Sequence, residues 1–194
     1  MDAKLLLQIV GVALGLLYLW LEYRADIWLW AVGMAMPIVH GILYFKAGLY
    51  ADCSMQVYYV AAGLYGLAVW HRRARKVKRG PSADISPVPA RLVVPLAAAY
   101  AAAHAAIYLL LVHFTDSSVP FWDSMTTALS IVAMWMLSRK YIGQWCVWMA
   151  VDAITAALYI YKDIPLTAAL YILYTALAAA GYLRWRRLYR GVAH

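Results

Sequence analysis

Charged side chains are scarce in this sequence: lysine, arginine, aspartate and glutamate together make up 13% of its 194 residues. Apolar residues make up 66%, and the mean hydropathy is +0.68. A soluble domain of this length needs polar side chains to cover its surface, and here they are too few. The shortage excludes a soluble protein and predicts a chain that lies in a lipid bilayer.

Cysteine and clusters of reactive residues are also scarce. The two cysteines, Cys53 and Cys146, are predicted at opposite membrane faces, so they cannot pair, and a metal site would need more ligands. The sequence has no paired aspartates, Ser–His pair or H-E-x-x-H motif of the kind that an intramembrane enzyme needs. We therefore predict no enzymatic activity, no metal and no cofactor.

What the sequence does contain is a series of apolar stretches, each near the roughly 20 residues that a membrane-spanning helix needs. We predict an all-α membrane protein with seven transmembrane helices. The expected spans are 5–21, 27–45, 52–70, 92–112, 121–138, 142–161 and 164–184. The first resembles a signal peptide, but one basic residue precedes it and no clear cleavage site follows, so we interpret it as a mature helix.

The net charge of +8 is concentrated on one side of the predicted membrane. Alternating the connections places 14 of the 17 lysines and arginines on the side of the C-terminus, seven of them in the segment 71–91. Cytoplasmic loops carry such an excess, so the N-terminus is predicted outside and the C-terminus in the cytoplasm. The basic segment is interpreted as a topology signal that contacts anionic lipid headgroups, and no nucleic acid is expected.

A repeat becomes visible when the chain is shifted by 115 residues along itself. Matches among alanine, leucine and valine carry little weight in this composition, but recurring tryptophans do. The informative pairs are Arg24 with Arg139, Trp30 with Trp145, Tyr44 with Tyr159, Tyr59 with Tyr174, Gly66 with Gly181 and Trp70 with Trp185.

The repeat predicts how a single transmembrane domain over 1–194 is organised. Its parts are a repeat at 5–70, a basic cytoplasmic loop at 71–91, a linker helix at 92–112, a second repeat at 120–185 and a basic cytoplasmic tail at 186–194. One linker helix restores the chain direction, so the repeats should run parallel, and in such transporters the substrate site lies between the halves near the membrane midplane.

Asp152 is the residue that points to a site. It lies about 11 residues into the sixth span, which is roughly 16 Å of helix and close to the middle of a hydrocarbon core about 30 Å thick. A carboxylate is costly there and indicates function by default. A purely structural pairing with a hydroxyl or a histidine is the alternative.

Aromatic residues accompany this carboxylate at helical spacing. Ring faces attract positive charge, so the combination predicts a planar cationic ligand, with phenol and amide groups to bind hydroxyls or a carboxamide. The candidate substrate-binding residues are Trp30, Gln56, Tyr59, Trp145, Trp148, Asp152 and Tyr174.

Other polar and aromatic residues have simpler interpretations. Trp70, Trp122 and Trp185 lie near span ends and are expected to anchor the membrane interface. Tyr100, His104 and Tyr108 are expected to form a packing face. Asp123 is expected either to cap its helix or to lie at the mouth of a pathway.

Four motifs, taken in order, resemble the PnuC family of bacterial vitamin transporters over nearly the whole chain. They are GLYADCSMQVYYVAAGLYGLAVW, WDSMTTALS, QWCVWMAVDA and LYIYKDIPLTAALYILYTALAAAGYLRW. The resemblance implies a three-one-three helix arrangement like that of the SWEET sugar transporters, a location in the bacterial inner membrane and facilitated diffusion of nicotinamide riboside. It further implies that a cytoplasmic kinase acts on the substrate only, and that the carrier is a homo-oligomer such as a trimer.

The pocket motifs of the family fall on Gln56, Tyr59, Trp145, Trp148 and position 152. Members that carry nicotinamide riboside tend to have an amide at the last of these positions, where this sequence has an aspartate. The sequence DIWLWAVG at the second helix also differs from the motif that is more usual in the family. Both differences keep open the thiamine branch of the family. A sugar carrier of the same architecture is a more distant alternative, because it has less need of a buried charge and the sequence lacks a Pro-Gln motif.

Overall fold

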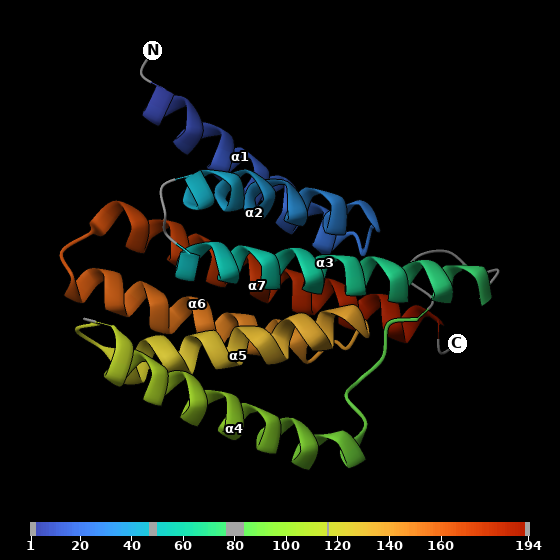
Figure 1. Cartoon of the computed structure of the whole chain (residues 1–194). Coiled ribbons are helices and arrows are strands. Elements are labelled where there is room, and N and C mark those ends of the chain that lie inside the picture. The colour runs from blue at the N-terminus through green and yellow to red at the C-terminus, as the bar shows by residue number, and fades with distance from the viewer. Residues whose placement is uncertain (1–2, 47–49, 77–83, 116, 193–194) are drawn as a thin grey trace. The chain divides into compact units, whose positions relative to one another are not determined.

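The computed structural model describes residues 3–46, 50–76, 84–115 and 117–192, which form seven α-helices and no β-strand (Figure 1). The predicted all-α fold with seven helices is thereby confirmed. The chain divides into two compact units, residues 1–84 and 85–194, and each is considered by itself. In the described part of the chain, Ala90–Phe114 and Pro165–Gly191 are long and apolar enough to cross a membrane, and Val12–Tyr23 and Trp28–Ile42 are shorter apolar stretches.

The first unit contains α1 (Ala3–Tyr23), α2 (Trp28–Lys46) and α3 (Tyr50–Lys76). Helix α2 packs against both α1 and α3. Helix α3 continues past its predicted end at Trp70 into the basic run, because arginine, lysine and alanine are strong helix formers. The first part of the predicted loop 71–91 is therefore helical.

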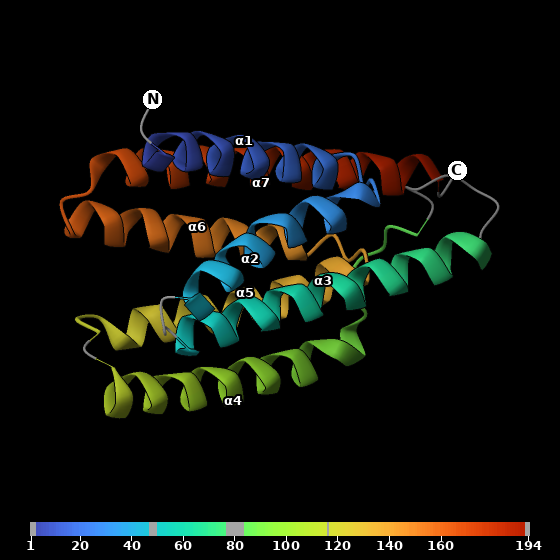
Figure 2. The same cartoon turned by 45° about the horizontal axis from the view of Figure 1, so that its top comes forward.

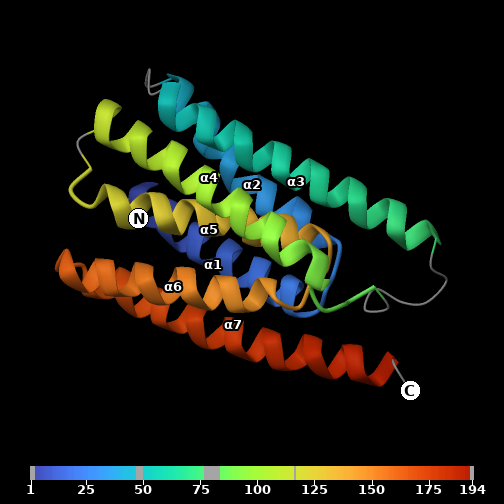
Figure 3. The same ribbon diagram turned by 90° about the horizontal axis from the view of Figure 1, so that it is seen from below.

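The second unit contains α4 (Ala90–Phe114), α5 (Pro120–Ser138), α6 (Gln144–Tyr161) and α7 (Pro165–Val192). Each helix packs against the next along the chain, and Figures 2 and 3 both show α6 and α7 side by side along their length. Helix α7 continues through the arginine-rich segment that the sequence suggested as a tail. Helix α7 is therefore longer than the apolar span 164–184 that was predicted for it.

Helix α4 contacts α5 through an aromatic face. The imidazole of His104 lies parallel to the Tyr100 ring at 5.7 Å, meets the edge of Phe121 at 5.1 Å, and its Nδ1 lies 3.1 Å from the Ser124 hydroxyl. None of the residues of α4 is buried, because α5 covers one side of it only. The packing interpretation of Tyr100, His104 and Tyr108 agrees with these contacts.

Asp123 does not cap α5. The N-cap residue is Val119, whose own side chain makes no capping hydrogen bond, and its N–H donates to the Ser117 hydroxyl at 3.3 Å. Asp123 lies in the first turn, where its carboxylate accepts a hydrogen bond of 2.6 Å from the Ser117 hydroxyl in the preceding loop. The capping interpretation is therefore wrong, and the carboxylate orders the approach to the helix instead.

The segment before α4 docks on the turn between α5 and α6. Ser86 forms a parallel β-bridge with Tyr141: its N–H donates to the Lys140 carbonyl at 3.2 Å, and its own carbonyl accepts from the Ile142 N–H at 2.9 Å. Ile85 is buried beside this bridge. Backbone hydrogen bonds thus fix the chain to the second unit before α4 begins.

The turns that follow α1 and α5 have the same local geometry at the offset of 115 residues. Ala25 and Lys140 are both left-handed, with φ of 55° and 56°. One residue earlier, Arg24 lies over the Trp20 ring at 4.7 Å and Arg139 lies over the Trp135 ring at 5.4 Å. The two units therefore share this turn, whereas the parallel arrangement of the repeats in the membrane stays a prediction.

Candidate substrate-binding site

The centre of α6 carries the predicted carboxylate. Asp152 is 9% exposed, and among the described residues none forms a hydrogen bond or ion pair with it. Burying a carboxylate without a partner is costly, and proteins that retain one usually offset the cost with a ligand or a counter-charge. Asp152 is thus a candidate binding group for a cation.

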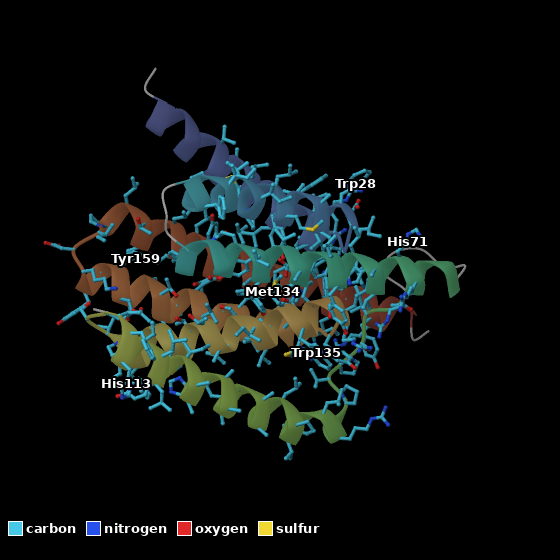
Figure 4. The ribbon with its side chains drawn as sticks, in the orientation of Figure 1. Trp28, His71, His113, Met134, Trp135 and Tyr159 are labelled. Carbon is cyan, nitrogen blue, oxygen red and sulfur yellow. The ribbon has the colours of Figure 1, made fainter. Side chains whose placement is uncertain are left out.

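A row of tyrosines leads toward the C-terminal end of α6 and the N-terminal half of α7. Tyr174 lies on α7, which packs along α6 (Figure 3). The Tyr174 ring meets Tyr171 edge to face at 5.7 Å, and Tyr171 stacks on Tyr159 of α6 at 5.5 Å with 16° between the planes. Figure 4 shows Tyr159 near one end of the second unit and Trp135 toward the other.

The predicted tryptophans of α6 differ in their surroundings. Trp145 is 1% exposed and meets Trp185 of α7 edge to face at 5.6 Å. Its ring fills the space above Gly181, where a Cβ would lie 2.6 Å from ring atoms. Trp148, one turn closer to Asp152, is half-buried where Trp145 is enclosed, and the indole Nε1 of each has no hydrogen-bond partner within the described residues. Trp148 is therefore the indole better placed to meet a ligand.

Trp30 in the first unit repeats the arrangement of Trp145. It is 1% exposed, meets Trp70 edge to face at 5.7 Å, and its ring covers Gly66. The expectation that Trp70 and Trp185 anchor the membrane interface is wrong, because they are 2% and 0% exposed in these helix contacts. Trp30 and Trp145 hold their helix pairs together, and direct contact with a substrate stays a prediction for both.

The other candidates of the first unit lie on α3. Gln56 is half-buried and packs against Gly41 of α2, and Tyr59 is 37% exposed and meets Tyr58 edge to face at 5.5 Å. Three residues apart on a helix, Gln56 and Tyr59 face similar directions. The side chains of Tyr44 and Cys53, which the sequence analysis also used, lie outside the described residues.

Sequence reasoning missed Gln144, the first residue of α6. Its side chain is 0% exposed, and neither amide atom has a hydrogen-bond partner in the described part of the chain. The repeat contained the signal, because the partner of Gln144 at the offset of 115 residues is the apolar Leu29.

The chain is similar to known transporters in its sequence and in its fold. A family model described as nicotinamide mononucleotide transporter matches residues 5–187. The nicotinamide riboside transporter PnuC of Escherichia coli strain K12 is 25% identical, covering 92% of this chain and 84% of that protein. The riboflavin/roseoflavin transporter RibM of Streptomyces davaonensis is 27% identical, covering 92% and 83%. A crystal structure of the vitamin B3 transporter PnuC superimposes with a TM-score of 0.67 and 22% identity over 90% of this chain and 78% of that one, which shows the shared fold.

Proposed function

The chain belongs to the nicotinamide mononucleotide transporter family, and we propose that it imports nicotinamide riboside across the bacterial inner membrane by facilitated diffusion. Family membership makes it an integral membrane transport protein. The relatives named as nicotinamide riboside transporters suggest this vitamin as the substrate. The carboxylate on α6 suits the positive charge of that substrate. A cytoplasmic kinase would then trap the imported molecule without binding the carrier.

The single observation that carries the proposal is the buried carboxylate of Asp152, one helical turn from the indole of Trp148 on α6. Nicotinamide riboside contains a pyridinium ring, which is flat and positively charged. A carboxylate in a site of low dielectric balances that charge, and each desolvated ring face adds about 0.5–2 kcal/mol of cation–π attraction. In this proposal Asp152 is the counter-charge and Trp148 and Tyr174 provide the aromatic surroundings.

The remaining candidates take supporting roles in the proposal. Gln56 and Tyr59 carry amide and phenol groups suited to the hydroxyls or the carboxamide of the vitamin. Trp30 and Trp145 fix the backbones that carry the binding residues, since both rings are enclosed in helix contacts. Access is proposed to alternate between the two membrane faces around this site.

Thiamine is the second candidate substrate, because the family resemblance implies an amide at position 152 in carriers of nicotinamide riboside and this chain has an aspartate there. Its thiazolium ring is also a flat cation, so the same carboxylate suits it. Riboflavin, which the relative RibM is named for, has a neutral ring system and gives Asp152 no charge to balance. The charge of the substrate therefore separates riboflavin from the two cationic candidates.

A binding and uptake panel tests the proposal. Purified protein is titrated with nicotinamide riboside, thiamine and riboflavin while its melting temperature is followed, and uptake of each is measured in proteoliposomes. We expect stabilisation and uptake with nicotinamide riboside and weaker effects with the neutral flavin. Preference for riboflavin would overturn the cationic substrate, and preference for thiamine would change the vitamin but keep the charge argument.

A further inference from the structure

The whole side-chain amide of Gln144 is buried in the second unit. Its side chain is 0% exposed, and neither Oε1 nor Nε2 has a hydrogen-bond partner within residues 3–46, 50–76, 84–115 and 117–192. An amide can make several hydrogen bonds, and leaving them all unmade in the interior destabilises the folded state. A residue of this kind in a folded protein calls for an explanation.

Its position on α6 suggests the explanation. Gln144, Trp148 and Asp152 follow one another at intervals of four residues, so they lie along one side of the helix. The indole Nε1 of Trp148 is likewise buried without a partner in the described residues. An amide, an indole N–H and a carboxylate thus mark successive turns over about 12 Å of helix.

The repeat shows that packing alone does not require an amide here. Leu29 occupies the equivalent place at the start of α2 and is also 0% exposed. The residues that follow, Trp30 and Trp145, make the same edge-to-face contacts in their units. An apolar side chain therefore fits this position in the first unit, whereas the second unit has the polar Gln144 at the equivalent position.

We propose that Gln144 is a second binding station for the substrate, at the N-terminal end of α6, and that it takes the neutral, hydroxyl-bearing part of the vitamin. This inference rests on the transport function proposed above. Asp152 holds the cationic ring in the middle of the helix, and Trp148 and Gln144 offer hydrogen bonds to hydroxyls as the substrate moves toward that end. The amide is enclosed in this conformation and becomes accessible when that end of the carrier opens.

The test separates a transport role from a packing role. Gln144→Leu places the repeat-partner residue at this position, and Gln144→Met offers an unbranched side chain of similar size. For each variant, the melting temperature, the affinity for nicotinamide riboside and the maximal uptake rate in proteoliposomes are measured. We expect an unchanged or higher melting temperature, unchanged affinity within about twofold, and a maximal rate lowered by about five- to tenfold.

Two further variants complete the comparison. Gln144→Asn keeps the amide on a shorter stem and should retain more of the uptake rate than Gln144→Leu. Cys146→Leu adds apolar bulk to an exposed position of the same helical turn and should leave uptake unchanged. Full uptake in both apolar variants, or a fall in melting temperature in both, would assign Gln144 to packing and overturn the proposal.

The outcome does not depend on the identity of the vitamin. If the wild-type protein carries thiamine or riboflavin in place of nicotinamide riboside, the proposed substrate is wrong, and the same variants are measured with the vitamin that it carries. Both alternatives bear hydroxyl groups, so the expected loss of rate is the same. A wild-type protein that carries none of the three overturns the transport function and the second station with it.

Discussion

The indole of Trp145 occupies the space that a side chain at Gly181 would need. A Cβ at Gly181 would lie 2.6 Å from atoms of this ring, and the ring has no room to retreat because Trp185 meets it edge to face. The contact between α6 and α7 therefore requires glycine at this position. Gly66 has the same relationship to Trp30 in the first unit.

Gly181→Ala should lower the stability of the protein although alanine is the better helix former. Overpacking against a fixed ring costs about 1–3 kcal/mol, which outweighs a gain of about 1 kcal/mol in helix propensity. The melting temperature in detergent measures the balance. Gly191→Ala is the matched control, because nothing lies within 4 Å of a Cβ at that position. Equal melting temperatures for the two variants would contradict the close contact.

Asp152→Asn should weaken binding of the cationic vitamin while leaving the fold intact. The change is nearly isosteric and removes only the charge, and losing a partly desolvated ion pair costs on the order of 2–4 kcal/mol, or roughly thirty- to a thousand-fold in affinity. The affinity is measured for nicotinamide riboside and for its neutral, reduced-ring analogue. Equal losses for both ligands would make Asp152 a packing or gating residue.

Transport should reach equal concentrations on both sides of the membrane and stop there. Coupled carriers usually place a second ionisable group beside the substrate site, and Asp152 is the one carboxylate that the sequence places deep inside a predicted span. Uptake into proteoliposomes, followed to its plateau, measures this. Accumulation above equilibrium that a protonophore abolishes would show instead that Asp152 relays protons.

The C-terminal ends of α3 and α7 should face the cytoplasm, because the basic residues gather there. Single cysteines at Arg72 and Gly191, introduced after removal of Cys53 and Cys146, should resist an impermeant thiol reagent in intact cells. A cysteine at Lys162 should react from outside. The reverse pattern of labelling would invert the topology.

The number of helices and their approximate ends could be predicted from the sequence, because apolar spans and charged breaks alternate clearly. The extensions of α3 and α7 could not, since hydropathy marks the edge of an apolar stretch and helix propensity continues through arginines such as those at 184–190. Two of the three tryptophans near span ends, Trp70 and Trp185, were misassigned for a related reason. The position of a residue within a predicted span does not show that Trp70 and Trp185 point toward a neighbouring helix.

The candidate site was predictable where one helix carries it. Spacing along α6 placed Trp148 near Asp152, and both lie on that helix as expected. The stacking of Tyr159 on Tyr171 depends on the register between α6 and α7, which the sequence does not specify. Gln144 was missed because it is the first residue of α6, where an amide is ordinary, and only the structure shows that its side chain is buried without a partner in the described residues.

The bridge between Ser86 and the turn after α5 has a consequence for how the protein tolerates mutation. Both of its hydrogen bonds join backbone atoms, with the N–H groups of Ser86 and Ile142 as donors. Most side chains at these two positions leave the donors in place, whereas proline at either removes one. These two hydrogen bonds therefore persist through substitutions that keep the buried packing of Ile85 and Ile142.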